Sequence, residues 1–190
     1  FMGVQSSGTS VIFVVDVSGS MISGEKSMKT YEVLEREVIR FIRNLDERSG
    51  FGIVVFSKDA RSYKQQLVRA TREEKDRGIN WLKKLTPENY KNPKLDEEER
   101  NFHHGTRADR GLAEAFEMRP DIVFFISDGE PTGASPTQIL RQVEQAQVNA
   151  SKKTAVNAVA YLADSGQSFM RELAEKNGGT FREVNPRDVK

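Results

Sequence analysis

Short apolar runs alternate with amphipathic stretches along most of this chain. Val11–Val15 and Ile122–Ile126 are unbroken apolar runs, rich in β-branched and aromatic residues, as expected for strands that are buried on both faces. Between them, Lys29–Leu45 repeats its apolar residues at a helical spacing, which predicts a helix with one apolar stripe. That stripe comprises Leu34, Val38, Phe41, Ile42 and Leu45.

The same patterns predict the remaining elements. Further strands are expected over Phe51–Phe56, Ala60–Tyr63, Thr154–Tyr161 and Thr180–Val184, and further helices over Thr71–Leu85, Arg107–Glu117, Ser135–Asn149 and Ser168–Lys176. The tight connection between the strands at 51–56 and 60–63 predicts an antiparallel hairpin at one sheet edge. The polar stretch Thr86–Gly105 is expected to be a long loop, which in a compact domain is usually functional or mobile.

This alternation predicts an α/β fold. We expect a three-layer, doubly wound (Rossmann-like) and mostly parallel sheet, with one antiparallel edge strand and helices on both faces. In such sheets, ligands bind beyond the carboxyl ends of the strands, where the strand order reverses. Residues that directly follow the two most apolar runs are therefore candidates for a binding site.

The chain has 190 residues, which corresponds most simply to one domain. We expect an N-terminal extension at 1–8, the domain at 9–185 and a short tail at 186–190. Because the chain starts with Phe1 and Met2, we interpret it as a domain cut from a longer protein or as the product of a designed expression gene. No apolar stretch reaches the ~18 residues that a membrane-spanning helix needs, so we expect no membrane contact by this segment.

Charge and cysteine content exclude several classes of function. The net charge of +1, from 29 basic and 28 acidic residues, is unlike the basic footprint of a nucleic-acid-binding protein. Because the chain has no cysteine, disulfides and cysteine-based zinc or iron–sulfur sites are excluded.

Three polar clusters, far apart in the sequence, suit a single metal ion. Asp16, Ser18 and Ser20 follow the first apolar run at alternate positions, and Asp128 follows the run at 122–126. Thr106 precedes a predicted helix. Alternate residues of an extended segment face the same way, and carboxylates and hydroxyls are hard ligands that suit Mg²⁺, Mn²⁺ or Ca²⁺.

These residues carry a family resemblance. Asp16-Val17-Ser18-Gly19-Ser20, then Thr106, then Ser127-Asp128-Gly129 resembles the metal-ion-dependent adhesion site (MIDAS) of von Willebrand factor A (vWA) domains, in the family's order. The resemblance implies that the two serines bind Mg²⁺, Mn²⁺ or Ca²⁺ directly, and that Thr106 binds directly or through water. The two aspartates would act through water or by hydrogen bonds.

A cation held mainly by neutral hydroxyls keeps much of its positive charge. The resemblance therefore implies a protein-binding module, with no catalytic residue, whose metal is completed by an Asp or Glu carboxylate of a partner protein. The turn at 57–60 and the loops at 86–105 and 129–135 would set specificity. We favour an extracellular or cell-envelope location over a cytoplasmic one.

Two features depart from the family pattern. His103 and His104 stand where the family often has glycine before the threonine, and we interpret them as plain loop residues, not as zinc ligands. The tail after the last strand is too short for the terminal helix that drives affinity switching in integrin-type members.

Three other functions compete with this interpretation. The segment Gly19–Ser27 is one residue away from a P-loop, but Glu25 inserts an unfavourable carboxylate there. A metal-dependent hydrolase or phosphatase would need a nucleophile or base beside the metal, and the sequence offers only a weak Ser20–His103–Asp128 grouping. The third alternative is a vWA scaffold, in a larger intracellular or envelope complex, whose metal is purely structural.

Overall fold

A seven-stranded sheet forms the centre of the computed structural model, which describes residues 9–23, 26–148, 150–163 and 165–184. The strand order is β3-β2-β1-β5-β6-β7, and β4 pairs with β2 beside this path. The predicted N-terminal extension and C-terminal tail lie outside the described residues. The strands are β1 (Ser10–Asp16), β2 (Gly50–Phe56), β3 (Ala60–Ser62), β4 (Val68–Arg69), β5 (Ile122–Ser127), β6 (Ala155–Tyr161) and β7 (Phe181–Val184).

Strand pairing confirms the predicted fold class. β1 pairs in parallel with β2 on one side and with β5 on the other, and β5, β6 and β7 continue in parallel. The hairpin strand β3 runs antiparallel to β2, as predicted. The two-residue strand β4, also antiparallel to β2, was not predicted. Its lone half-buried valine offers too little apolar pattern to mark a strand.

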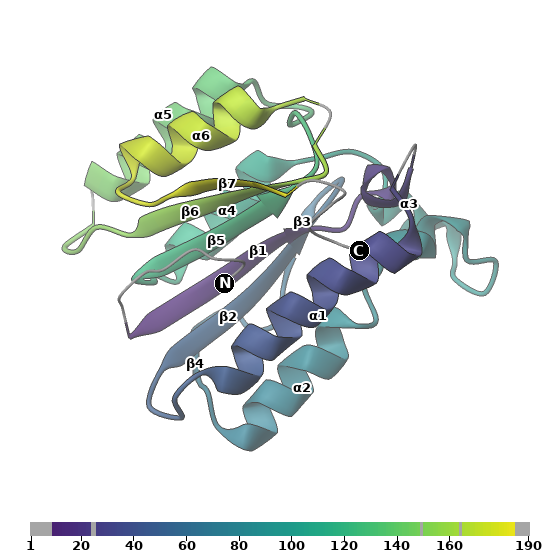
Figure 1. Ribbon diagram of the computed structural model, residues 1–190, viewed down its shortest axis with the longest axis horizontal. Coiled ribbons are helices and arrows are strands. Elements are labelled where there is room, and N and C mark those ends of the chain that lie inside the picture. Colours follow the sequence, from purple (N-terminus) through teal and green to yellow (C-terminus); the bar gives the residue numbers. More distant parts are fainter. Residues whose placement is uncertain (1–8, 24–25, 149, 164, 185–190) are drawn as a thin grey trace.

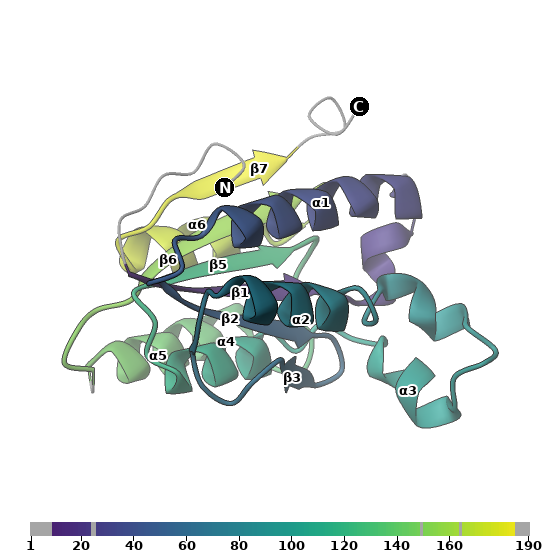
Figure 2. The same cartoon turned by 90° about the horizontal axis from the view of Figure 1, so that it is seen from below.

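Helices cover both faces of this sheet and make three layers (Figure 1, Figure 2). Side chains of α1 and α2 pack on one face, and those of α4, α5 and α6 pack on the other. The six α-helices that the structure describes are α1 (Met28–Asn44), α2 (Arg72–Leu82), α3 (Glu97–Phe102), α4 (Ala108–Glu117), α5 (Pro136–Val148) and α6 (Gln167–Lys176). None of these helices is both long and apolar enough to cross a membrane.

Local sequence explains where several helices begin. Ser135 Oγ accepts a hydrogen bond from Gln138 N, and the Gln138 side chain accepts one from Ser135 N, which together form a capping box. Thr71 caps α2 through Glu74 N, although α2 ends at Leu82 and not near Leu85 as predicted.

The stretch between α2 and α4 is more ordered than predicted. A 3₁₀ helix occupies Pro87–Lys91, and α3 follows with Asp96 as its N-cap. Helices this short show little apolar periodicity, because only one or two side chains reach the core; in α3 that side chain is Phe102. α3 and its flanking segments project beyond the carboxyl end of the sheet (Figure 1, Figure 2).

Candidate functional site

The candidate residues lie where the strand order reverses. β1 stands between β2 and β5, with Val15 paired to Val55 on one side and to Ile126 on the other. The connections that follow β1 and β5 lead to helices on opposite faces of the sheet. This divergence opens a crevice at the carboxyl ends of the two strands. Asp16 ends β1 and Asp128 directly follows β5, so this register brings the two aspartates close together.

Asp16 is a buried carboxylate that is held from both sides. Its Oδ2 accepts a hydrogen bond from Ser127 Oγ at 2.7 Å, and its Oδ1 accepts one from Ser18 N at 2.9 Å. Burial, followed by the charge of Asp128, raises the pKa of Asp16 to about 7, against the opposing effect of these hydrogen bonds. The two hydrogen bonds thus fix the orientation of the Asp16 carboxylate, and a nearby positive charge would stabilise its ionised form.

Ser18, Ser20 and Asp128 form one chain of hydrogen bonds. The two serine hydroxyl oxygens lie 2.8 Å apart, and Ser20 Oγ donates to Asp128 Oδ1 at 3.1 Å. The backbone is extended at Ser18 and then enters a 3₁₀ helix at Gly19–Ile22. The serines therefore meet across the start of this tight turn, and not along a fully extended segment as predicted.

Lys26 also belongs to this cluster. Its Nζ lies 2.7 Å from Asp128 Oδ2, and the side chains of Lys26 and Asp128 are only 6% and 3% exposed. Sequence reasoning noticed Lys26 only as the lysine of a near-miss P-loop. Several backbone N–H groups of that segment already donate within the fold, among them those of Gly19, Met21, Ser23 and Lys26. These groups do not form the open phosphate cradle that a P-loop needs.

Backbone hydrogen bonds hold Thr106 at the same edge of the sheet. Thr106 N donates to Thr132 Oγ1 at 2.7 Å, and Thr132 N donates back to Thr106 O at 2.8 Å. On the other side, Ser57 Oγ donates to Gly105 O at 2.9 Å. Within the described part of the chain, no hydrogen bond joins the Thr106 hydroxyl to the other four candidates. Sequence reasoning missed the positioning roles of Ser57 and Thr132, since a lone hydroxyl residue in a turn carries no distinctive signal.

The interpretation of His103 as a plain loop residue is wrong. Its side chain is buried, its Nδ1 lies 2.8 Å from Val17 O, and its carbonyl accepts a hydrogen bond from Gly19 N at 2.9 Å. A carbonyl only accepts, so Nδ1 carries the proton and donates. Burial lowers the pKa of His103, which favours this neutral form. His104, in contrast, is exposed.

The candidate residues offer oxygen atoms of the kind that a hard cation prefers. Asp16, Ser18, Ser20 and Asp128 supply two carboxylates and two hydroxyls, with Thr106 at the same edge. Among the described residues no cluster of three or more His, Cys, Asp or Glu side chains is found, so a site at this edge depends on hydroxyl oxygens. Oxygen ligands of this kind suit Mg²⁺, Mn²⁺ or Ca²⁺.

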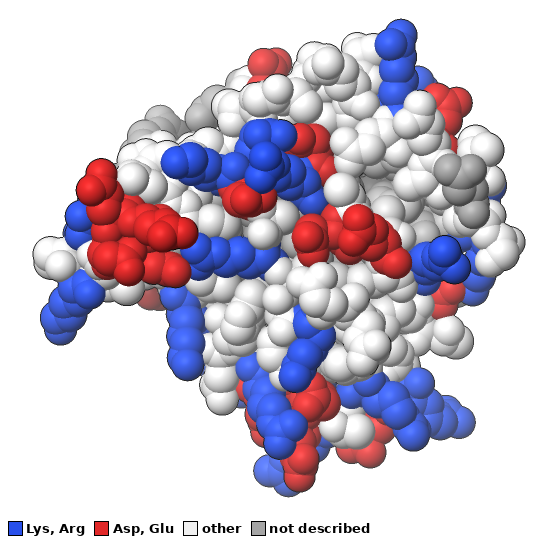
Figure 3. Space-filling view, turned by 180° about the vertical axis from the view of Figure 1, so that it is seen from behind, with Lys and Arg blue, Asp and Glu red and all other residues white. Residues whose placement is uncertain are grey.

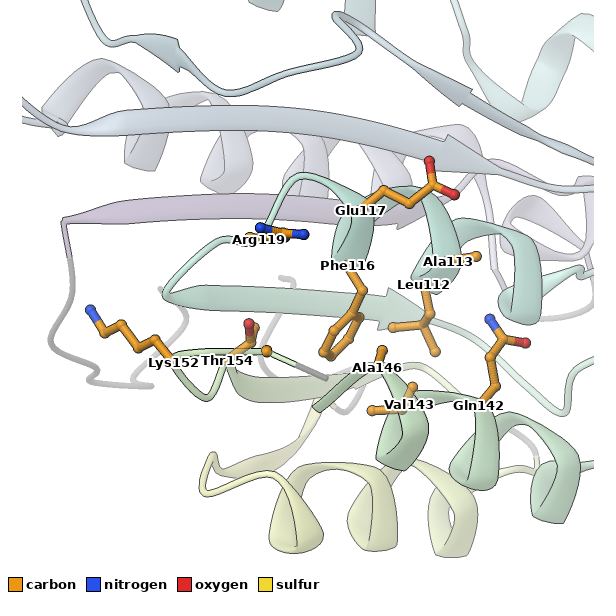
Figure 4. A pocket seen from close by; sticks show the side chains of 11 residues that line it. Leu112, Ala113, Phe116, Glu117, Arg119, Gln142, Val143, Ala146, Lys152 and Thr154 are labelled. Atoms are coloured by element: carbon orange, nitrogen blue, oxygen red, sulfur yellow. The ribbon is translucent and has the colours of Figure 1, made fainter. Parts of the chain in front are cut away.

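Two of the hollows outside this cluster are lined in part by residues of α4. One, of about 390 Å³ between α4 and α5, is lined by Leu112, Phe116 and Val143 and has Arg119 and Lys152 at one end (Figure 4). Arg119 and Lys152 precede β5 and β6, so this hollow lies toward the opposite edge of the sheet. The other, of about 810 Å³, lies near the candidate residues and is lined by Lys58, Asp59, Ala60, Arg61, Glu97, Glu98, Asn101, Phe102, Arg107 and Arg110.

Comparison with known families agrees with the fold. Residues 9–182 match the von Willebrand factor type A domain, which is most of the chain. The chain belongs to this family. The vWA match begins just before β1 and ends within β7, so it contains all five candidate residues.

Curated relatives of this vWA domain are much longer proteins. The chain is 26% identical to mouse inter-alpha-trypsin inhibitor heavy chain 4, over 92% of this chain and 18% of that protein. It is also 26% identical to human inter-alpha-trypsin inhibitor heavy chain H4, over 96% of this chain and 19% of that protein. The chain thus spans less than a fifth of the length of these relatives.

Solved structures share the fold at low sequence identity. A von Willebrand factor type A protein from Catenulispora acidiphila has a TM-score of 0.76 at 18% identity, covering 97% of this chain and 40% of that one. The pilus adhesin SpaC from Lactobacillus rhamnosus has a TM-score of 0.70 at 13% identity, covering 97% and 29%. Proximal thread matrix protein 1 from mussel byssus, with a zinc-occupied MIDAS motif, has a TM-score of 0.66 at 16% identity, covering 94% and 44%.

Proposed function

We propose that this vWA domain binds a partner protein through a divalent cation held at the carboxyl edge of its sheet. Ser18, Ser20 and Thr106 would supply neutral oxygens to Mg²⁺ or Mn²⁺. Asp16 and Asp128 would supply negative charge and orient bound water. The observation that carries the proposal is the hydrogen-bonded chain of Ser18, Ser20 and Asp128, with the oriented carboxylate of Asp16 beside it.

The shortage of charged ligands supports an open site. Three direct hydroxyl ligands, from Ser18, Ser20 and Thr106, are fewer than the six to eight oxygens that Ca²⁺ takes, and Mg²⁺ commonly completes its shell with water. An Asp or Glu side chain of a partner would replace one such water and form a charge-assisted contact. This role needs no catalytic residue, and we propose none.

The surface beside the site offers contacts for such a partner. The hollow of about 810 Å³ brings basic residues Lys58, Arg107 and Arg110 together with acidic residues at the start of α3. In the view of Figure 3, acidic side chains gather at the margin where α3 lies, and elsewhere the two signs are interspersed. We propose that the turn at 57–60, the segment 86–105 and the loop at 129–135 set partner specificity.

Relatives support a protein-binding role outside the cytoplasm. Curated relatives are inter-alpha-trypsin inhibitor heavy chains, and structures of this fold include a pilus adhesin and a byssus matrix protein. The mussel protein's occupied MIDAS shows that this fold holds a metal there in that protein. We extend both properties, metal binding and an extracellular or envelope location, to this domain as part of the proposal.

Thermal unfolding with and without metal tests the proposal. A cation that binds only the folded state must stabilise it, so Mg²⁺ or Mn²⁺ should raise the melting temperature and EDTA should reverse the change. The double variant Ser18→Ala/Ser20→Ala should lose this response. Asp76→Ala, which removes an exposed carboxylate on α2, should keep it. A wild-type domain without a reversible shift, or a double variant with an undiminished one, would contradict the proposal.

A further inference from the structure

Each carboxylate oxygen of Asp128 has a partner within the protein. Its Oδ1 accepts from the Ser20 hydroxyl at 3.1 Å, and its Oδ2 accepts from the Lys26 ammonium at 2.7 Å. Lys26 and Asp128 are both buried, so water screens their attraction only weakly. A cation that approaches Asp128 therefore meets a carboxylate whose charge is already paired.

Lys26 lies where a divalent cation would need negative charge. Asp16, Asp128 and Lys26 together carry a net charge of −1 when all three are ionised. Adding a divalent cation while Lys26 stayed in place would bring two cations close together in a poorly solvated pocket. Like charges at short range in such a medium repel strongly, so metal and ammonium should exclude each other from Asp128.

We propose that Lys26 is a tethered cation that competes with the divalent metal for Asp128. The inference rests on the proposed metal site and adds a residue that sets its affinity. Without metal, the ammonium neutralises Asp128 and stabilises the site; when metal binds, the ammonium gives up Oδ2. Lys26 thus keeps the empty site folded at the cost of weaker metal binding.

The proposal predicts opposite effects of one substitution on two quantities. Lys26→Met keeps an unbranched chain of similar length and removes the charge, which leaves Asp128 buried and unpaired when no metal is present. The metal-free melting temperature should therefore fall. The dissociation constant for Mn²⁺ should fall about tenfold or more, since each tenfold corresponds to ~1.4 kcal/mol of competition removed.

Calorimetric titration with Mn²⁺ and thermal unfolding at zero and saturating Mn²⁺ measure both quantities. Lys29→Met removes the same charge from an exposed position three residues away, and should change neither the Mn²⁺ affinity nor the stability appreciably. The expected result is a tighter Lys26→Met variant whose melting temperature converges on the wild-type value when Mn²⁺ saturates both proteins. If Lys26→Met does not fold without metal, Lys26→Gln serves instead, because its amide can donate to Asp128 without carrying charge.

The outcomes separate this inference from the proposed function. An unchanged Mn²⁺ affinity in the variant, with a stability deficit that persists at saturating Mn²⁺, would show a structural ion pair and overturn the inference while the metal site stands. Absence of Mn²⁺ binding in both proteins would remove the proposed function and the inference together. Binding by the variant alone would support the competition at Asp128 but overturn the proposed function, because the native domain would then hold no metal.

Discussion

Two residues outside the sequence motif, Lys26 and His103, make contacts that hold the candidate site together. The DxSxS pattern and Asp128 were evident from the sequence, because each follows an apolar run that predicts a buried strand. The roles of Lys26 and His103 were not, because their partners lie far away in sequence: 102 residues separate Lys26 from Asp128, and 86 separate His103 from Val17. Only the fold brings such pairs together.

His103 should act as a positioning residue for the proposed metal-binding loop. His103→Ala removes the hydrogen bond to Val17 O and leaves a small cavity, so we expect a loss of stability of about 2–4 kcal/mol and weaker Mn²⁺ binding. Urea unfolding and calorimetric titration measure the two effects.

His103→Asn separates positioning from packing. The Asn amide can donate in place of Nδ1–H, so we expect Mn²⁺ affinity to recover more fully than stability. His104→Ala, at the adjacent exposed position, serves as the control and should leave both quantities near their wild-type values. Equal Mn²⁺ affinity in the wild type and His103→Ala would refute the positioning role.

At the scale of elements, most helices and every strand except the two-residue β4 were predictable, whereas the short connecting helices were not. β1, β2 and β5 contain apolar runs that predict buried strands. The capping residues Ser135 and Gln138 mark the start of α5. The segment 86–105 contains α3, but its acidic first turn, Glu97–Glu99, gives no apolar periodicity. Its order comes from long-range contacts such as the bond from Lys58 N to Phe102 O.

Asp121 joins three elements at the opposite edge of the sheet. It accepts hydrogen bonds from Thr9 N, Thr9 Oγ1 and Ser10 N at the start of β1, and from Lys152 ahead of β6. Burial acts to raise the pKa of Asp121, but the bonds from Lys152 and Thr9 outweigh it and leave this pKa below its usual value. A lowered carboxyl pKa stabilises the fold above the unfolded-state pKa of about 4 and less as the pH falls below it.

Asp121→Asn should therefore lose stability in a pH-dependent way. At pH 7 we expect a cost of about 1–3 kcal/mol, because the ionised acceptor of several hydrogen bonds is lost. The difference between wild type and variant should shrink as the pH is lowered from 5 toward 3. Urea unfolding at several pH values measures it, and a difference that stays constant with pH would contradict the assigned cause.

At the scale of the whole molecule, topology turns separate clusters into one site. Because β1 lies between β2 and β5, the loops that follow these three strands meet at one edge of the sheet. Hydrogen bonds hold the segment 102–107 between these loops. Ser57 fixes it from the β2 side and Thr132 from the β5 side. The position of Asp16 and Asp128 directly after apolar runs predicted this edge of the sheet, whereas the polar contacts that hold the segment there required the structure.

A crystal structure with Mn²⁺, using its anomalous scattering, tests the central claim most directly. The account predicts one anomalous peak per chain at about 2.0–2.6 Å from the hydroxyl oxygens of Ser18 and Ser20, with at least one coordination position open to solvent and Lys26 withdrawn from Asp128. A site without a peak, or a metal enclosed entirely by protein ligands, would contradict a cation that awaits a partner's carboxylate.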